Sequence, residues 1–180
     1  MYGMILKLMK FNFSILLLLL FANCNGNLSN YNRNTDTIPK NVIIDSIVVL
    51  KAARQLSIFC NKKEIKTYEI GLGKNPIGKK QFEGDMKTPE GLYTIDAKSA
   101  YSKFHKNLNI SYPNASDIKY AKSQGKKAGS EIKIHGLPNG YNEKDYVRKD
   151  WTWGCIALTN TEIDELFEHV KIGCTILIMP

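Results

Sequence analysis

The chain has 180 residues, of which 43% are hydrophobic and 23% are charged, and its formal net charge is +8 at pH 7. These proportions are typical of folded proteins, so wholesale disorder is excluded, and the length suits one compact domain with a single active site. The lysines are scattered rather than interleaved with aromatic residues. This indicates no nucleic-acid partner, and it leaves either attraction to an anionic polymer or a merely solvated basic surface.

The first 23 residues have the pattern of a signal peptide. Lys7 and Lys10 precede an apolar run over residues 15–22, which is far shorter than the roughly 20 residues that cross a bilayer. Cys24 follows this run and resembles the lipobox cysteine at which bacterial lipoproteins are cleaved and acylated. We therefore predict export to the cell envelope or periplasm with a lipid anchor on this cysteine, the alternative being ordinary secretion. Residues 24–41 are polar and rich in Asn, which is typical of a flexible tether.

Residues 42–180 carry the hydrophobic periodicity of one folded domain. Apolar residues alternate with polar ones over 43–51, 56–60 and 68–72, and polar breaks separate these runs, so we predict antiparallel strands joined by hairpins. Further strands are expected in three segments of similar composition, 91–97, 131–135 and 174–179. The predicted fold class is mainly β, with a curved mixed sheet or a sandwich.

Only one helix, near the C-terminus, has a clear sequence signature. Apolar residues recur with helical spacing over 163–170, and Thr159 with Glu162 forms a capping-box pattern ahead of them. Gly173 is expected to close this helix. Residues 98–130, in contrast, show little periodicity. Because long irregular insertions in compact domains are commonly lids or binding loops, we predict a long substrate-facing flap there.

Cys155 stands apart from the other cysteines as a candidate nucleophile. Cys60 and Cys174 lie in apolar alternating runs, where a thiol behaves as a small buried hydrophobe. Cys155 instead follows Gly154 just ahead of the predicted helix, and glycine allows a substrate carbonyl to approach the backbone closely. With Cys24 acylated, at least one of the other three thiols stays unpaired, and whether Cys60 and Cys174 pair is left open.

A nucleophilic thiol needs a neighbouring base, and the sequence offers His105, His135 and His169. His135 ends a predicted strand, from which a catalytic side chain can be aimed rigidly; the alternative is a structural strand-end histidine. The cysteines and histidines lack the close paired spacing of zinc sites. The glycines of residues 71–78 lack the following helix and acidic partner of a dinucleotide site. We therefore expect neither a metal nor a cofactor.

Separated motifs resemble those of the L,D-transpeptidase catalytic-domain family (YkuD-like). The family signature, in which His-Gly precedes a Ser/Thr-x-Gly-Cys element, is similar to residues 134–136 (IHG) and 152–156 (TWGCI). Its Gly-Asp, Thr-Pro-x-Gly hairpin is similar to residues 84–93 (GDMKTPEGLY), in which we expect the acidic side chains to be structural. The resemblance covers about residues 44–179 and includes Tyr112-Pro113-Asn114, which is found in an envelope lipoprotein branch.

The resemblance implies a catalytic arrangement. Cys155 would be the nucleophile and His135 its proton acceptor, with the main-chain carbonyl of Thr152 orienting the imidazole. Backbone amides near Gly154 and Cys155 would form the oxyanion hole. Trp153 stands where many members carry a second histidine, so His135 is the sole candidate base.

The resemblance also implies a substrate. It would be a peptidoglycan stem peptide, contacted by Gly136, Trp153, Tyr112 and Asn114. Ala157 stands where other members carry an arginine, so no carboxylate contact is expected from that position. The resemblance further implies that carbapenem-type β-lactams acylate the nucleophile, and we expect the protein to be a monomer.

The expected reaction runs through a thioester on Cys155. The thiolate would attack the carbonyl that joins the L-stereocentre of diaminopimelate to a terminal D-alanine, and a second stem-peptide amine would then take the acyl group to give a direct crosslink. With water as acceptor the same residues would make an L,D-carboxypeptidase or a hydrolase, and the sequence leaves this open. A non-catalytic peptidoglycan-binding lipoprotein is a further alternative, against which the presence of both His135 and Cys155 argues.

Overall fold

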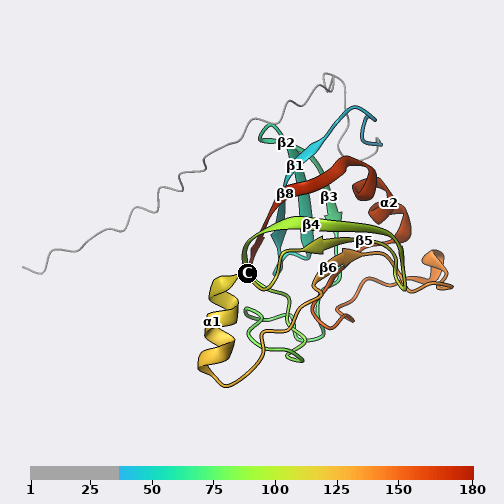
Figure 1. Cartoon of the computed structure of the whole chain (residues 1–180). Coiled ribbons are helices and arrows are strands. Elements are labelled where there is room, and N and C mark those ends of the chain that lie inside the picture. Colours follow the sequence, from blue (N-terminus) through green and yellow to red (C-terminus); the bar gives the residue numbers. More distant parts are fainter. Residues whose placement is uncertain (1–36) are drawn as a thin grey trace, which may run out of the picture.

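A curled mixed β-sheet with two α-helices makes up the domain (Figure 1). The computed structural model describes residues 37–180. The strands are β1 Ile44–Leu50, β2 Gln55–Cys60, β3 Lys63–Glu69, β4 Gly91–Ser102, β5 His105–Ile110, β6 Lys133–His135, β7 Ile156–Ala157 and β8 Val170–Met179. Their order across the sheet is β3-β2-β1-β8-β4-β5-β6-β7. The predicted mainly β class with a curved mixed sheet is confirmed.

The predicted signal peptide, the proposed lipidation site Cys24 and most of the predicted tether lie outside the described residues. At the end of that tether, Ile38 is buried in the hydrophobic core, and its N–H donates to Glu165 Oε1 at 3.0 Å. The packed domain therefore begins before Val42, the boundary that composition suggested.

Strand β8 joins the two parts of the sheet. It pairs in parallel with β1, where Ile47 lies opposite Ile176, and antiparallel with β4, where Tyr93 lies opposite the same residue. All three side chains are buried in one hydrophobic core that extends from β1 to α2. Because burying a large apolar side chain is worth about 1.5–3 kcal/mol, the buried residues of these central strands stabilise the fold.

Helix α2 (Asn160–His169) is the helix that the sequence predicted. The Thr159 side chain accepts a hydrogen bond from the Glu162 N–H, and the Glu162 carboxylate accepts one from the Thr159 N–H, so the predicted capping box is confirmed. Ile163 is fully buried on the face that packs against β5 and β6. The helix ends where β8 begins, ahead of the predicted end near Gly173.

The segment predicted as a long flap, 98–130, is mostly regular structure. Strand β4 continues to Ser102, β5 follows, and a second helix, α1 (Ala115–Ser123), lies beyond the sheet. The apolar pattern missed β5 because Asn107 is among its buried residues, and it missed α1 because only Asp117 and Ala121 of this helix are buried. Within residues 37–180 no helix is both long and apolar enough to cross a membrane.

Candidate active site

The edge of the sheet made by β6 and β7 carries both predicted catalytic residues. These strands are parallel, with Ile134 opposite Ile156 and His135 opposite Ala157. Side chains alternate between the two faces of a strand, so continuing the register one residue back from β7 puts Cys155 on the same face as His135, offset from it by two residues. Such diagonal neighbours are about 7–8 Å apart at the backbone, which is within reach of an imidazole and a thiol.

The imidazole of His135 is buried and held in one tautomer. Its Nδ1 lies 2.7 Å from the carbonyl oxygen of Gly136. A carbonyl can only accept, so Nδ1 carries the proton and Nε2 keeps a free lone pair. The rings of Phe104 and Trp151 flank the imidazole at centroid distances of 4.7 and 5.6 Å. Burial lowers the pKa of His135 below its ordinary 6.5, so the imidazole is neutral at neutral pH and can accept a proton through Nε2.

The carbonyl that orients the imidazole is therefore not the one predicted. The sequence comparison implied that of Thr152, but the Thr152 carbonyl accepts the N–H of Lys74 at 3.0 Å, and Gly136 orients His135 instead. The physical reason is local, because the carbonyl of the residue after His135 already lies within hydrogen-bonding distance of its ring. Gly136 thus supports the base through its backbone, and this is the one role in the site that the structure gives it.

The Cys155 thiol rests against the backbone of the segment before β6. Its Sγ donates to the carbonyl of Glu131 at 3.4 Å. Burial raises the pKa of the Cys155 thiol above its ordinary 9.0, and a backbone hydrogen bond from Lys133 together with the charge of that lysine opposes the rise only in part. At rest, thiol and imidazole are both neutral. A thiol in this state could act as a nucleophile only if a base such as His135 took its proton during the attack.

The Thr152 hydroxyl holds the loop of residues 152–155, here called the nucleophile loop. The Oγ1 donates to the Cys155 carbonyl at 2.7 Å and accepts the N–H of Gly154 at 3.1 Å. The Gly154 N–H therefore already donates to a side chain within the loop. It was predicted to contribute to an oxyanion hole, and this hydrogen bond argues against that role. The Cys155 N–H has no acceptor among residues 37–180, so it is the backbone donor that remains for that purpose.

Replacing Thr152 by Val should destabilise the domain and slow any reaction at Cys155. The new side chain has nearly the same volume but no hydroxyl, which leaves the Gly154 N–H and the Cys155 carbonyl without partners. A buried polar group left unpaired costs about 1–3 kcal/mol, so we expect a loss of that size in the free energy of unfolding, measured by urea titration. Thr152→Ser keeps the hydroxyl and should stay within about 1 kcal/mol of the parent protein. Equal stability of Thr152→Val and the parent would contradict this account.

Gly154 is required for steric reasons. Its φ is +129°, a conformation that side chains rarely adopt, and an added Cβ would lie 2.6 Å from the Lys87 carbonyl oxygen. At Gly73 an added Cβ would lie 2.1 Å from the carbonyl oxygen of Met86. The segment around residues 86–87 therefore packs directly against the nucleophile loop and against residues 70–73. Strand β3 ends at Glu69, so the strand predicted over 68–72 is not continuous, and beyond it Gly71 and Gly73 form isolated bridges with Ala157 and Thr152.

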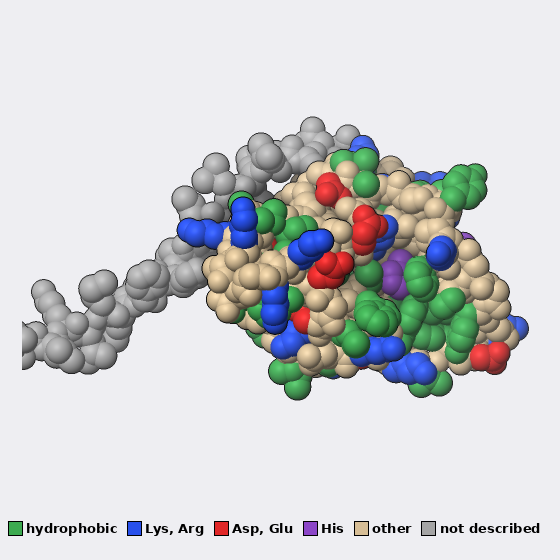
Figure 2. All heavy atoms as spheres, turned by 60° about the horizontal axis from the view of Figure 1, so that its bottom comes forward, with side chains coloured by type: hydrophobic (Ala, Val, Ile, Leu, Met, Phe, Trp, Pro, Cys, Tyr) green, Lys and Arg blue, Asp and Glu red, His purple; other side chains and the backbone are tan. Residues whose placement is uncertain are grey.

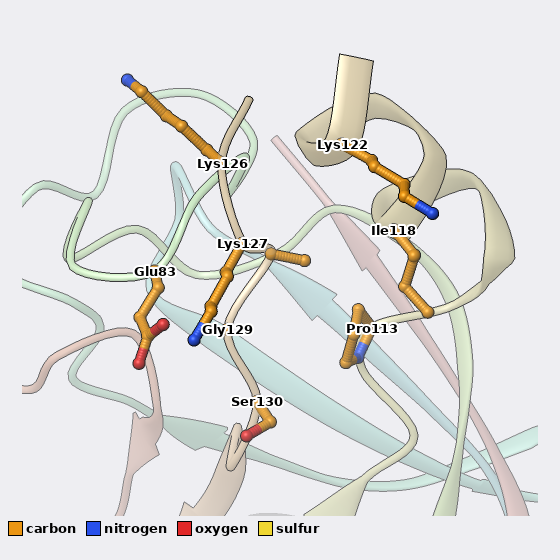
Figure 3. Close-up of a pocket in the computed structure, with 9 residues that line it drawn as sticks. Glu83, Pro113, Ile118, Lys122, Lys126, Lys127, Gly129 and Ser130 are labelled. Atoms are coloured by element: carbon orange, nitrogen blue, oxygen red, sulfur yellow. The ribbon is translucent and has the colours of Figure 1, made fainter. Parts of the chain in front are cut away.

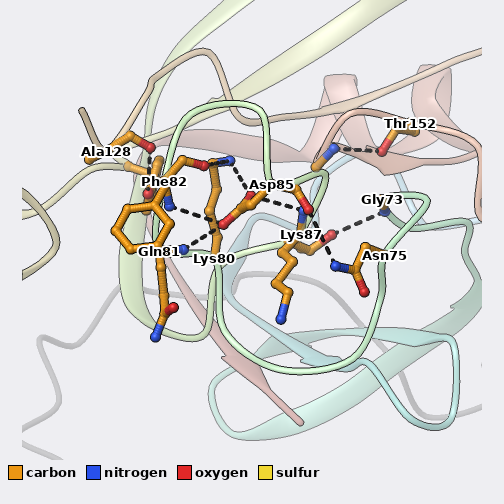
Figure 4. Close-up of polar contacts among 12 residues, drawn as sticks. Gly73, Asn75, Lys80, Gln81, Phe82, Asp85, Lys87, Ala128 and Thr152 are labelled. Carbon is orange, nitrogen blue, oxygen red and sulfur yellow. Dashed lines mark hydrogen bonds and ion pairs between the residues drawn. The ribbon is translucent and has the colours of Figure 1, made fainter. Parts of the chain in front are cut away.

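The hairpin motif is built around Asp85 (Figure 4). Its carboxylate pairs with Lys80 Nζ at 2.8 Å and accepts backbone N–H groups from Gln81, Phe82 and Lys87 at 2.7, 3.0 and 3.1 Å. Burial alone would raise the pKa of Asp85, but these hydrogen bonds outweigh it and hold the pKa below 3.8. The expected structural role of this carboxylate agrees with its contacts.

Two further predicted site residues serve the structure. Tyr112 is 5% exposed, and its hydroxyl donates to the carbonyl of Ala128 at 2.9 Å, so it does not offer a surface to substrate. Asn114 caps α1, and its side chain accepts the N–H groups of Ser116 and Asp117 at 3.0 Å. Both had been predicted to contact substrate. Their position instead fixes the start of α1.

Trp153 is the predicted substrate contact that is open to solvent. It is 65% exposed, two residues before Cys155, and Lys74 Nζ lies 5.7 Å from its ring centroid. On one face of the domain, hydrophobic side chains gather beside a histidine and are bordered by lysines and arginines (Figure 2). A large exposed aromatic ring next to a nucleophile can pack against a bound peptide.

The structure adds site residues that sequence analysis missed. Phe104 and Trp151 hold the imidazole, and Trp151 Nε1 donates to Tyr146 Oη at 3.3 Å. Asp150 pairs with Arg54 at 2.7 Å and accepts the Leu72 N–H at 2.9 Å. Its place two residues before the TWGCI segment was the available signal.

The described residues offer no metal site, and the remaining cysteines and histidines lie elsewhere. Within residues 37–180 no group of three His, Cys, Asp or Glu side chains could hold a metal ion. Cys174 is a buried free thiol in β8, and it therefore does not pair with Cys60. His105 pairs with Asp164 at 2.7 Å, and His169 Nδ1 lies 2.8 Å from the Val42 carbonyl oxygen.

Comparison with known proteins extends these observations. Residues 44–178 match the YkuD family model, the L,D-transpeptidase catalytic domain. YafK of Escherichia coli (strain K12) is 32% identical over 130 residues, which cover 69% of this chain and 46% of that protein. YqjB of Bacillus subtilis (strain 168) is 27% identical over 133 residues, covering 73% and 69%. Among solved structures, the helical cell shape determining protein Pgp2 of Campylobacter jejuni is 27% identical with a TM-score of 0.59, over 75% of this chain and 47% of that one.

A histidine at the end of β6 and a cysteine just before β7 supply the two residue types that an enzyme with a thiol nucleophile needs. The chain belongs to the L,D-transpeptidase catalytic-domain family, as the sequence predicted. It spans about half the length of YafK and of Pgp2. The lipoprotein branch within the family stays a prediction.

Proposed function

We propose that the chain is a cysteine L,D-transpeptidase that acts on peptidoglycan stem peptides through a thioester on Cys155. The observation that carries this proposal is the register of β6 and β7, which brings Cys155 and a neutral His135 to one face of the sheet edge. Family membership supports the class of substrate. The names of the relatives, which include a protein that determines helical cell shape, agree with a role at the cell wall.

In the first half of the reaction the acyl group moves to sulfur. The Cys155 thiol passes its proton to His135 Nε2 while the sulfur attacks the peptide carbonyl, and a bond from carbon to sulfur forms. The Cys155 N–H is placed to stabilise the oxyanion, a type of contact whose removal costs about 10²–10³ in rate. The C–N bond then breaks, His135 returns the proton to the departing amine, and the thioester remains.

In the second half an acceptor releases the acyl group. An amine of a second stem peptide gives up a proton to His135 as it attacks the thioester, the C–S bond breaks, and Cys155 recovers a proton as the thiol. Water in place of the amine gives an L,D-carboxypeptidase or hydrolase. One observation favours this second candidate: residues 98–130, predicted to form a long substrate-facing flap, belong mostly to β4, β5 and α1, which leaves less chain to close over the site and exclude water.

We further propose that the protein works in the cell envelope as a monomer, exported by its N-terminal segment and lipid-anchored through Cys24. The charge and apolar pattern of residues 1–24 supports this. Metabolic labelling with a palmitate analogue, compared between the native chain and Cys24→Ser, measures the anchor directly.

The deciding experiment is mass analysis of purified muropeptides after incubation with the protein. A new dimer identifies transfer, and a shortened monomer identifies hydrolysis. Cys155→Ala should give neither product, whereas Cys174→Ala, which removes the buried thiol of β8, should give the same product as the parent. Unchanged muropeptides with the folded parent protein, across donors and acceptors, would refute the proposed function.

A further inference from the structure

A basic groove of about 440 Å³ lies between α1 and the segment 126–130 (Figure 3). We call it the lysine groove. Its lining includes three lysines, an apolar side chain of α1, an acidic residue across from that helix and a serine at one end; these are Lys122, Lys126, Lys127, Ile118, Glu83 and Ser130.

The lysine groove leads to the nucleophile along the backbone. Ser130 at its end is followed by Glu131, whose carbonyl accepts the hydrogen bond from Cys155 Sγ at 3.4 Å. The next side chain, Ile132, would lie 3.1 Å from a Cβ added to Gly154. The segment 130–132 therefore links the groove to the Cys155 sulfur along the backbone.

The lysines of the groove differ from those next to it. Lys51, Lys79 and Lys80 each pair with a carboxylate at 2.7 to 2.8 Å. Among residues 37–180, no ion pair involves any of the three groove lysines. The lining thus carries three ammonium groups without an ion pair and one carboxylate, that of Glu83, and Lys126 Nζ lies 4.1 Å from the centroid of the Phe82 ring. Such a site concentrates anions.

The backbone of the groove is held in place. The Glu83 N–H donates to the Lys127 carbonyl at 2.9 Å, and the Tyr112 hydroxyl donates to the carbonyl of Ala128 at 2.9 Å. Gly129 has a φ of +81°, and an added Cβ would lie 3.1 Å from Glu83 Cα, so the two segments are in close contact. Only lysine side chains would have to be ordered on binding, and a site that needs little ordering keeps more of its binding free energy.

We infer that the lysine groove binds carboxylate groups of the peptide that reacts at Cys155. The inference rests on the proposed function, because stem peptides carry free carboxylates on their D-amino acid and diaminopimelate residues. Ammonium groups hold carboxylates through charge-assisted hydrogen bonds. Ile118, which is 50% exposed, adds an apolar contact for the peptide chain. Tyr112 and Asn114 would then act on the groove rather than on the substrate, since Tyr112 holds the segment 126–130 and Asn114 caps α1.

Peptide binding to Cys155→Ala protein, which cannot turn the ligand over, tests the inference. The probes are a muramyl tetrapeptide with free carboxylates and the same peptide with its carboxylates amidated, measured by calorimetry. Protein with the groove lysines intact should bind the free peptide about five- to tenfold more tightly than the amidated peptide, and added salt should reduce this difference in affinity. Lys122→Gln with Lys127→Gln should abolish the preference. The matched control, Lys119→Gln with Lys144→Gln, removes two exposed lysines outside the groove and should keep it.

Equal affinities of the parent groove for both peptides would overturn the inference, as would an undiminished preference in the double groove variant. The proposed function has its own readout, which is turnover of the free peptide by protein with Cys155 intact. If the protein turns the peptide over but shows no carboxylate preference, only the inference about the groove fails. If it shows the preference but no turnover, the inference about the groove stands and the proposed function fails.

Discussion

Replacing Cys155 by Ala should abolish turnover of stem peptides while leaving the fold intact. The acyl group then has no sulfur to receive it, and removing such a nucleophile costs on the order of 10⁴-fold or more in rate. The other free thiol cannot substitute, because Cys174 is buried and burial raises its pKa to about 12. Product formation is followed by mass spectrometry of muropeptides, and folding by near-ultraviolet circular dichroism.

The same variant should also fail to form an adduct with a carbapenem-type β-lactam. Intact-mass spectrometry of the parent protein should show one added drug mass, and Cys174→Ala should show it as well. An adduct on Cys155→Ala, or turnover by that variant above the level of a mock preparation, would remove Cys155 from the role of nucleophile.

Replacing His135 by Asn should lower the rate by about 10²–10⁴-fold, the usual contribution of a positioned base. Asn can still donate to the Gly136 carbonyl, so this hydrogen bond can be kept while proton acceptance is lost. His105→Asn is the matched control, because this histidine pairs with Asp164 on the surface and should tolerate the change. Alkylation of Cys155 by iodoacetamide should slow in His135→Asn and stay unchanged in His105→Asn.

The pH dependence of the parent enzyme should report on the same imidazole. Burial lowers the pKa of His135, so the neutral, proton-accepting form persists below the ordinary value of 6.5. Activity should therefore fall only as the pH drops through that lowered pKa, and more than half of it should remain at pH 6.5. A half-maximal pH above 6.5 for kcat/KM would contradict the buried, neutral base.

Much of the fold could be predicted from the sequence because burial in the central strands is regular. The alternation in β1 and β2 and the capping box of α2 each reflect one dominant physical constraint, a buried face or a set of free N–H groups. Strand β5 does not show the alternation of apolar and polar residues, because one of its buried residues is the polar Asn107, which is 6% exposed. Helix α1 lacks a clear apolar stripe because it lies beyond the sheet and buries few residues. There the capping pair Asn114 and Asp117 was the better signal.

The motifs predicted Cys155 and His135 as the candidate reacting pair, but they did not predict the contacts that support this pair. The motifs place Cys155 and His135, since two short segments carry them. The supporting contacts join residues distant in the chain, such as Asp150 with Arg54 and the Gly154 loop with Lys87, and no local pattern encodes them. The carbonyl that accepts a hydrogen bond from the His135 ring is set by how the chain turns after β6. The sequence therefore could not predict Gly136 rather than Thr152 for this role.

The position of β8 between β1 and β4 sets an order in which the domain can assemble. Strands β1 to β3 can form from neighbouring segments alone, but the pairing of Ile44 with Val170 closes a loop that contains nearly the whole domain. Non-local pairings of this kind delay the rate-limiting step of folding. A nascent chain would hold a three-stranded meander with its β1 edge open until residues 170–179 arrive, and that edge is where a chaperone or a second unfinished copy would bind first.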